Sequence, residues 1–453
     1  MGGCPGDRRT APAAGAALTA RIARAQYTDR APSVVGGVRT IAGLEWTAAV
    51  GDLDAAGTPA GPDTAYRIGS ITKTFTAVLV MQLVADEAVA LTDPIGEHLP
   101  ELDLPGVSVQ SLLTHGAGLY AETDGPWWER SAGLTWEQLL PSIRQAHIPA
   151  SRFHYTNVGF AVLGQLVARL REKDWRDVLQ ERILDPLGLE RTTYDRPGSG
   201  AHGFAVHPYA DLVHDEPATD TGAMAPAGQL WSTAGDLLTF GQFLVRGAAE
   251  VLPDELRERM LVPTLVDDEP GERWARAYGL GVDVTNLGTA RYVGHGGSMP
   301  GFQSALRADP ESGDCAVLLM NSTAGIDLGA TELIAELRRH VPLLPAAWQP
   351  AQQHSGDLDL TGTWFWGPRP HVATLHGPDL VLTPVGSGRG ARFVRLARDR
   401  WLGQDGYFAG EPLQVHARGE RSAYLDVGSF RFTRTPYDPA SDIPGGVDDA
   451  GWH

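Results

Sequence analysis

The chain contains only two lysines, Lys73 and Lys173, and Lys73 follows Ser70 by three residues in the run YRIGSITKTFTAVLVMQL. Arginine stays protonated in proteins, whereas a lysine can lose its proton when it is desolvated. At the start of a helix, residues three apart lie on one face, so the amine and the hydroxyl would be neighbours. A neutral Lys73 could then take the proton from Ser70. The pair predicts a serine nucleophile with a lysine base.

Two further motifs follow in order along the chain. Tyr155 and Asn157, in RFHYTNVGF, open a run with the pattern of a helix, and His295, in RYVGHGGSMPGF, ends a run with the pattern of a strand. Gly296 and Gly297 would let a substrate backbone approach that strand closely. Taken singly, the tyrosine and asparagine could be helix caps and the histidine could be a structural strand-end residue.

The motifs Ser-x-x-Lys, Tyr-x-Asn and His-x-Gly, the last in place of Lys-Thr-Gly, resemble those of the penicillin-recognising serine hydrolases. The runs SLLTHGAGL, PAGQLWSTAGDLLTF and GSMPGF are similar to those of the branch that holds class C β-lactamases, DD-peptidases and esterases. The resemblance covers about residues 30–340. It implies an α/β (α+β) domain of the β-lactamase/DD-peptidase type.

The resemblance also implies a role for each motif residue. Ser70 would be acylated, Lys73 would be its base, and Tyr155 would be the second acid/base group. Asn157 would hold Lys73 or the substrate amide. His295 would stand where most β-lactamases carry the lysine that binds the β-lactam carboxylate, which argues against efficient β-lactam hydrolysis but not against acyl transfer.

Further contacts with substrate are expected around this centre. The backbone N–H groups of Ser70 and Ser298 would form the oxyanion hole. Trp127 and Trp128, in GPWWER, are either core residues or the rim of the cleft, and both are taken as substrate-binding candidates. Arg434, near the end of the chain, is either a residue that closes a barrel or one that positions a polar end of the substrate. His115, in LLTHGAGL, is expected to bond a loop backbone.

Sequence patterns divide the chain into five segments. Strand patterns over 36–68, a long apolar helix from residue 70, alternating helical runs, and strands before residue 340 predict a sheet built from both ends of one domain. Repeated short strands after a proline-rich linker predict a small all-β barrel, and Gly362-x-Trp364 resembles the first strand of a lipocalin-like barrel. The expected segments are a flexible N-terminus (1–30), whose floppy start is followed by a short helix, the catalytic domain (31–345), a linker (346–357), the barrel (358–436) and a loose tail (437–453).

Composition narrows the functional classes. A net charge of −18 argues against nucleic-acid binding, and no apolar run is long enough to span a bilayer. Residues 1–25 lack the apolar core of a signal peptide, and Cys4 and Cys315 give no reason to expect a disulfide, so a cytoplasmic location is predicted. We expect neither metal nor cofactor, because the spacing of His202, His207 and His214 matches no standard zinc site.

A β-lactamase-like domain followed by a lipocalin-like domain resembles the stand-alone penicillin-binding-protein-type thioesterases. That resemblance implies a peptide cyclase, which would take a peptidyl thioester with a D-configured C-terminal residue from a carrier protein of a peptide synthetase. Two alternatives stay open. One is a cytoplasmic serine hydrolase, such as an esterase, a D-aminopeptidase or a D,D-carboxypeptidase-like enzyme. The other is an inactive peptide-binding homologue.

Overall fold

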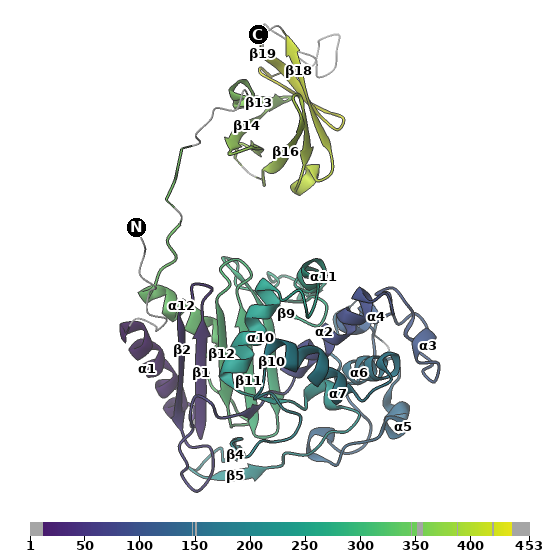
Figure 1. Ribbon diagram of the computed structural model, residues 1–453, viewed down its shortest axis with the longest axis vertical. Coiled ribbons are helices and arrows are strands. Elements are labelled where there is room, and N and C mark those ends of the chain that lie inside the picture. Colours follow the sequence, from purple (N-terminus) through teal and green to yellow (C-terminus); the bar gives the residue numbers. More distant parts are fainter. Residues whose placement is uncertain are drawn as a thin grey trace. The chain divides into compact units, whose positions relative to one another are not determined.

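The computed structural model describes residues 12–146, 148–149, 152–345, 347–350, 357–386, 388–418 and 421–436. The chain forms two compact units, Met1–Leu343 and Leu344–His453 (Figure 1). The predicted linker lies partly outside the described residues, and the predicted tail, 437–453, lies entirely outside them. Within the described ranges, no helix has the length and apolar character needed to cross a membrane.

An eight-stranded sheet with the order β2-β1-β12-β11-β10-β9-β8-β7 forms the centre of the first unit. Every neighbouring pair is antiparallel. The strands are β1 (Ser33–Arg39), β2 (Glu45–Gly51), β7 (Leu265–Asp267), β8 (Arg276–Tyr278), β9 (Asp283–Asn286), β10 (Arg291–Met299), β11 (Phe302–Ala308) and β12 (Cys315–Met320). The N-terminal hairpin therefore pairs with the last strand, as expected for a sheet built from both ends.

Helices cover both faces of this sheet, because its central strands are apolar on both sides. Val34 and Leu318 belong to one core cluster, which they share with residues of α1 and α12, whereas Val35 and Leu319 belong to the larger cluster with α2 and α10. Side chains that alternate along a strand point to opposite faces, so the two clusters are separate layers. The covering helices are α1 (Pro12–Thr28), α12 (Ala330–His340), α2 (Ile71–Ala85) and α10 (Ala234–Arg246).

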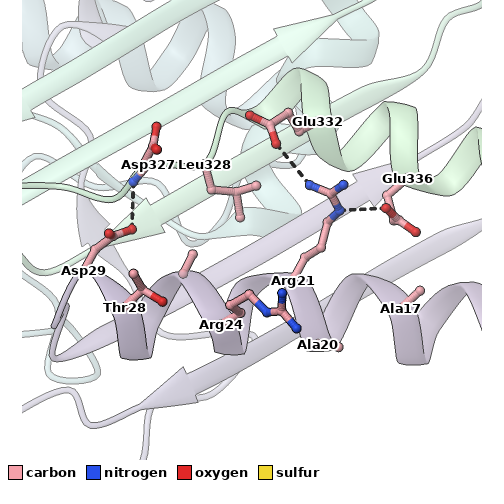
Figure 2. Close-up of a pocket in the computed structure, with 11 residues that line it drawn as sticks. Ala17, Ala20, Arg21, Arg24, Thr28, Asp29, Asp327, Leu328, Glu332 and Glu336 are labelled. Atoms are coloured by element: carbon pink, nitrogen blue, oxygen red, sulfur yellow. Dashed lines mark hydrogen bonds and ion pairs between the residues drawn. The ribbon is translucent and has the colours of Figure 1, made fainter.

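The short helix expected near the N-terminus is α1, whereas the flexibility expected for residues 1–30 is wrong for residues 12–28; residues 1–11 lie outside the described part. Ala14, Leu18 and Ile22 recur at a spacing of four residues and are fully buried, which fixes the helix on the sheet. Arg21 of α1 also pairs with Glu332 (3.0 Å) and Glu336 (2.6 Å) of α12 across a hollow of about 420 Å³ (Figure 2). An alanine-rich segment was mistaken for a flexible one because its apolar side chains are small.

The remaining helices of the first unit lie in the segment between β2 and β7. They include α3 (Ile95–His98), α4 (Val109–Leu113), α5 (Trp136–Leu139), α6 (Asn157–Arg171), α7 (Trp175–Leu179), α8 (Asp185–Leu187), α9 (Ala225–Gly228) and α11 (Asp254–Met260), together with the short hairpin of β4 (Gly203–Val206) and β5 (Val213–Glu216). One of the helical runs predicted from the sequence, TWEQLLPSIRQA (135–146), forms only the short helix α5. A 3₁₀ turn, Leu140–Ser142, follows α5 because Pro141 cannot continue the α-helical hydrogen bonds.

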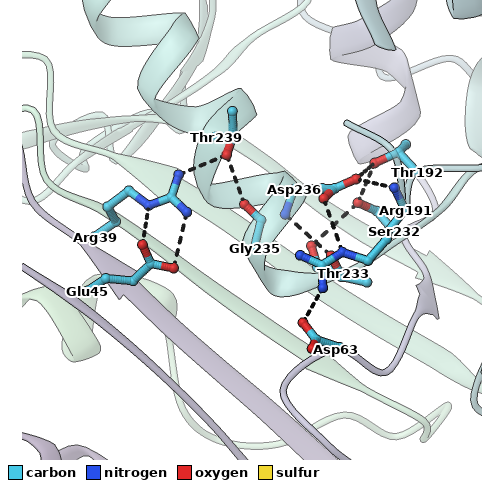
Figure 3. A network of polar contacts seen from close by, with 10 residues as sticks. All are labelled: Arg39, Glu45, Asp63, Arg191, Thr192, Ser232, Thr233, Gly235, Asp236 and Thr239. Carbon is cyan, nitrogen blue, oxygen red and sulfur yellow. Dashed lines mark hydrogen bonds and ion pairs between the residues drawn. The ribbon is translucent and has the colours of Figure 1, made fainter. Parts of the chain in front are cut away.

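A polar network fixes the short strand that leads into the predicted nucleophile. Strand β3 (Tyr66–Arg67) pairs with β6 (Trp231–Ser232), and β6 is held at the start of α10. Asp236 accepts hydrogen bonds from the backbone of Arg191 and the hydroxyl of Thr192, both at 2.9 Å, and Thr192 also bonds Ser232 at 2.8 Å (Figure 3). The entry to α2 is thereby anchored to the body of the domain.

The second unit is a closed antiparallel barrel of eight strands, which agrees with the predicted lipocalin-like domain. Trp364 is fully buried, and the guanidinium of Arg434 lies 3.7 Å from the centre of its ring. The run GYFAG, one of the short strands expected from the sequence pattern after the linker, is instead a 3₁₀ turn, Gly406–Phe408. The strands are β13 (Gly362–Trp366), β14 (Arg369–His376), β15 (Asp379–Pro384), β16 (Ala391–Ala397), β17 (Arg400–Gly403), β18 (Pro412–Arg418), β19 (Arg421–Val427) and β20 (Phe430–Thr433).

Candidate active site

Ser70 stands at the N-terminus of α2, a helix in which 13 of the 15 residues are buried. Its side chain makes no capping hydrogen bond, so its hydroxyl is not used to complete the helix. Gly69, immediately before it, has φ +51°, a conformation that glycine adopts without strain. Lys73 lies one turn further along the helix, as the sequence spacing predicts. The turn therefore presents the hydroxyl and the amine on the same side.

The amine of Lys73 is fully buried among neutral oxygens. Its Nζ lies 2.9 Å from the Ser70 Oγ, 2.6 Å from the Asn157 Oδ1 and 2.7 Å from the Ala227 carbonyl oxygen. Burial lowers the pKa of Lys73 to about 7, against the opposing effect of two nearby carboxylates. A neutral amine can donate to the amide and carbonyl oxygens and accept the hydroxyl proton, so the geometry fits a base that is ready at neutral pH.

Tyr155 contacts the same hydroxyl from the other side. Burial raises the pKa of Tyr155 well above its usual value, while a hydrogen bond with Ser70 works in the opposite direction. The ring of Tyr155 also lies beneath Lys73, with the Nζ 5.0 Å from its centre. The phenol is therefore protonated at neutral pH, and a protonated phenol beside the nucleophile suits the role of a proton donor to a leaving group.

Strand β10 passes unusually close to the Ser70 turn. A Cβ on Gly69 would lie 2.6 Å from the backbone nitrogen of Ser298, and a Cβ on Gly297 would lie 1.9 Å from the carbonyl oxygen of Ile68. The hydroxyl of Ser304 ties the same carbonyl down at 2.8 Å. Both positions therefore need glycine, because a side chain at either one would collide with the backbone of the opposite segment. The backbone amides of Ser70 and Ser298 belong to the segments that meet there, consistent with the predicted oxyanion hole.

His295 lines the cleft but is only 2% exposed. Its Nε2 bonds the hydroxyl of Tyr278, and its Nδ1 bonds the carbonyl oxygen of Gly296. Burial, followed by the charge of Lys73, lowers its pKa well below the usual value, so the ring is neutral. The residue therefore occupies the predicted wall without the charge of a lysine.

The cleft has a volume of about 530 Å³ and opens beside Ser70 and Tyr155. Gly296 and Gly297 line it as predicted, whereas neither Trp127 nor Trp128 does. Trp128 is 8% exposed and donates to Glu122 at 2.7 Å, so it belongs to the core rather than to the rim. Trp127 is 56% exposed, and its contact with substrate stays a prediction.

Arg434 lies in the other unit, where it holds the barrel together. Its guanidinium donates to the carbonyl oxygens of Asp359, Thr361 (2.9 Å) and Thr363 (3.3 Å). These bonds join the strand that precedes the C-terminus to the first strand and the turn before it. They support the structural interpretation of this arginine, and its proposed contact with substrate stays a prediction.

Sequence reasoning missed several residues of the site. Glu122 accepts from the Nδ2 of Asn157 at 2.7 Å and so fixes the amide that contacts Lys73. Arg276 and Arg307 both pair with Asp283, at 3.1 and 3.5 Å, and all three line the cleft. Glu122 lies in a loop without a motif, and the charged trio comes from three different strands, so no local pattern marks either. In the described ranges, no group of His, Cys, Asp and Glu suits a metal ion.

Comparison with known proteins agrees with this geometry. Residues 19–339 match the Beta-lactamase family, and residues 353–434 match a domain of unknown function, DUF7586. Penicillin-binding protein 4 of Amycolatopsis lactamdurans is 26% identical over 61% of this chain and 76% of its own length.

Two solved structures extend the comparison. A D-stereospecific amidohydrolase from Streptomyces sp. is 27% identical with a TM-score of 0.60, over 71% of this chain and 97% of its own. The structure of SurE is 24% identical with a TM-score of 0.60, over 93% of this chain and 99% of its own. The family match spans most of the chain and contains Ser70, Lys73, Tyr155 and His295, so this protein belongs to the Beta-lactamase family and carries a C-terminal eight-stranded barrel.

Proposed function

We propose that this protein is a serine acyltransferase that forms an acyl-Ser70 intermediate from a peptidyl thioester and releases the peptide by head-to-tail macrocyclisation. The observation that carries the acyl-transfer part is the buried amine of Lys73, 2.9 Å from the Ser70 Oγ, with a pKa of about 7. Such an amine is a base for the hydroxyl at neutral pH, whereas an ordinary surface lysine is not.

The first half of the reaction acylates the serine. The Ser70 oxygen attacks the thioester carbonyl while its proton passes to Lys73. The negative charge on the carbonyl oxygen is stabilised by the N–H groups of Ser70 and Ser298. When the C–S bond breaks, Tyr155 gives its proton to the departing thiolate, and the ammonium of Lys73 restores the proton of Tyr155.

The second half releases the acyl group. The peptide's own amine attacks the ester carbonyl, loses a proton to the neutral amine of Lys73, and expels the Ser70 oxygen, which takes that proton back from Lys73. Water competes for the same ester. An amine held against the carbonyl can reach an effective concentration of about 10⁵ M or more, which favours the ring when the cleft is preorganised.

Two observations support the choice of substrate. A relative that is 27% identical is a D-stereospecific amidohydrolase, which favours a D-configured residue at the acyl carbonyl. The structure of SurE matches 93% of this chain, a share that includes both the catalytic domain and the barrel. One of the solved structures of SurE is with D-Leu. The same amidohydrolase favours the second candidate, a hydrolase that gives the acyl group to water.

Synthetic peptidyl thioesters of about six to ten residues test the proposal. A D-terminal peptide is expected to give mainly ring, and its L-terminal epimer to react far more slowly, because the L side chain would point at the strand around Ser298. Mass spectrometry of the products separates ring from linear acid, and Ser70→Ala is expected to abolish the covalent adduct. If every D-terminal peptide gives linear acid, the cyclase proposal is wrong and the hydrolase is the remaining candidate. If the Ser70→Ala variant forms as much adduct as the wild type, Ser70 is not the nucleophile.

A further inference from the structure

Helix α4 ends in an unusual way directly beside the active site. After the last residue, Leu113, the backbone N–H of His115 bonds the carbonyl of Leu112 at 3.3 Å and that of Gly116 bonds the carbonyl of Ser111 at 2.8 Å. This pair of bonds is the common helix end in which one residue takes a left-handed conformation, and that residue is usually glycine. Here it is His115, with φ +60°, although a glycine follows immediately.

The other non-glycine residues with positive φ in the described ranges differ from His115 in their surroundings. Arg30, Glu87 and Glu172 have φ values of 54° to 55° and lie exposed at or just after helix ends. His115 has no exposed surface. A side chain kept at a strained, fully buried position implies that its contacts compensate for the strain.

Those contacts converge on the segment that carries Tyr155. The carbonyl oxygen of His115 accepts from the backbone N–H of His154 at 2.9 Å, and its Nδ1 accepts from that of Thr156 at 3.1 Å. Its ring stacks on the ring of Tyr155 with the centres 4.2 Å apart and the planes at 29°. One histidine thus holds both neighbours of Tyr155 through hydrogen bonds and the tyrosine ring through stacking.

The protonation state of the imidazole follows from the same geometry. Since Nδ1 accepts a backbone hydrogen bond, the proton of the neutral ring sits on Nε2, for which no described residue supplies an acceptor. The ring is surrounded by Tyr155, Phe160 and Tyr278, with centres 4.2 to 5.2 Å away. Nδ1 is occupied by the backbone of Thr156 and Nε2 hydrogen-bonds none of the described residues, so His115 has no hydrogen-bonded path to Ser70 and does not itself act as a base.

We propose that His115 is a positioning residue that fixes the phenol of Tyr155 against Ser70 through two backbone hydrogen bonds and one ring stack. This inference rests on the acyl-Ser70 chemistry proposed above but not on cyclisation. It explains why a histidine stands where helix termination alone would favour glycine. The sequence suggested only a histidine that bonds loop backbone, which the bond to Thr156 confirms.

His115→Asn separates positioning from folding. Asparagine tolerates the left-handed conformation and carries an acceptor near the Nδ1 position, but it lacks the ring. With the N-acetylcysteamine thioester of an N-acetylated D-amino acid, which cannot cyclise, we expect kcat to fall about 10²-fold with little change in KM, since a misplaced group costs about that much. His115→Gly, which also removes the backbone strain, is expected to be at least as impaired. His98→Asn, in a surface histidine paired with Asp93, is the matched control and is expected to be unchanged.

A double-mutant cycle with Tyr155→Phe decides whether the effect passes through Tyr155. Phenylalanine keeps the stacking ring and removes the hydroxyl, so His115→Asn should cause no further loss of kcat in that background. If the two single losses of kcat multiply in the double variant, the proposal is wrong. It is also wrong if both His115→Asn and His115→Gly keep the wild-type kcat. Thermal unfolding of each variant identifies losses that come from instability. If Ser70 of the wild-type protein forms no covalent adduct, the acyl-transfer proposal itself is wrong. That outcome differs from multiplicative losses of kcat, which can be measured only in an active enzyme.

Discussion

Lys73 in the catalytic unit and Arg434 in the barrel are cations in similar surroundings with different consequences. Each donates to neutral oxygens and lies over an aromatic ring, Tyr155 for Lys73 and Trp364 for Arg434. Burial lowers the pKa of both. For lysine the result is about 7, so the proton is mobile, whereas arginine starts so high that it stays charged. The same kind of environment thus makes a base from one side chain and a structural clamp from the other.

The largest expected effect comes from exchanging the two kinds of cation at the catalytic position. Lys73→Arg should be nearly as inactive as Lys73→Ala, with a loss of about 10⁴-fold in turnover, because a guanidinium cannot accept the proton of Ser70. Lys173→Arg, in the exposed pair with Glu181, is the control and should keep wild-type activity. Adduct formation with a fluorophosphonate probe, followed by mass spectrometry, measures the same loss. An arginine variant much more active than the alanine variant would contradict the base role.

A smaller effect is expected from pH. Because the acting form of Lys73 is the neutral amine, kcat/KM should rise about tenfold per pH unit below the pKa of about 7 and level off above it. A profile that is flat from pH 5 to 9 would show that another group is the base.

Glu122→Gln sharpens this test. Its carboxylate favours the ammonium form and so raises the pKa of Lys73, against the larger effect of burial. Removing that charge should move the rising limb of the profile to lower pH. Glu181→Gln, the matching change beside Lys173, should leave the profile in place.

The smallest effect on catalysis is expected from Arg434→Leu. The loss of its three hydrogen bonds and of its contact with Trp364 should destabilise the barrel by about 1–3 kcal/mol, measured by thermal or denaturant unfolding. Arg431→Leu, which breaks a partly exposed pair with Asp426, is the control and should cost less. Ser70 labelling should be unchanged in both. A loss of turnover on long peptides but not on a short thioester, at unchanged stability, would instead support a contact with substrate.

The sequence predicted the catalytic centre better than its surroundings. Ser70 and Lys73 are joined by helical spacing, which is local information, and Tyr155 and His295 came from ordered motifs. Glu122 contacts Asn157, Tyr278 contacts His295, and Arg276 lines the cleft. All three arrive there only through tertiary packing, so nothing near them in the chain marks them. Trp128 was ambiguous because an aromatic pair suits a core and a rim equally well.

The same division between local and tertiary information applies to the fold. The two-ended sheet and the barrel followed from hydrophobic patterns, and both were confirmed. Strand β11 was not predicted, since its buried face consists of Phe302, Ser304, Leu306 and Ala308, and the serine and the alanine weaken the apolar alternation. The short helix expected near the N-terminus is present as α1, but its length and firm packing were not predicted, because alanine-rich turns carry a weak apolar signal until they pack against a sheet.

The scarcity of lysine makes the central claim directly measurable. A protein labelled with ¹⁵N or ¹³C only in lysine would give two side-chain signals in solution NMR, one from Lys73 and one from Lys173. Lys73→Arg would assign them by removing one. In the wild-type protein, the chemical shift of the signal assigned to Lys73, followed during a titration, would report the protonation of that amine without any substrate. The composition of this chain therefore offers a spectroscopic view of the base that most enzymes, with dozens of lysines, do not.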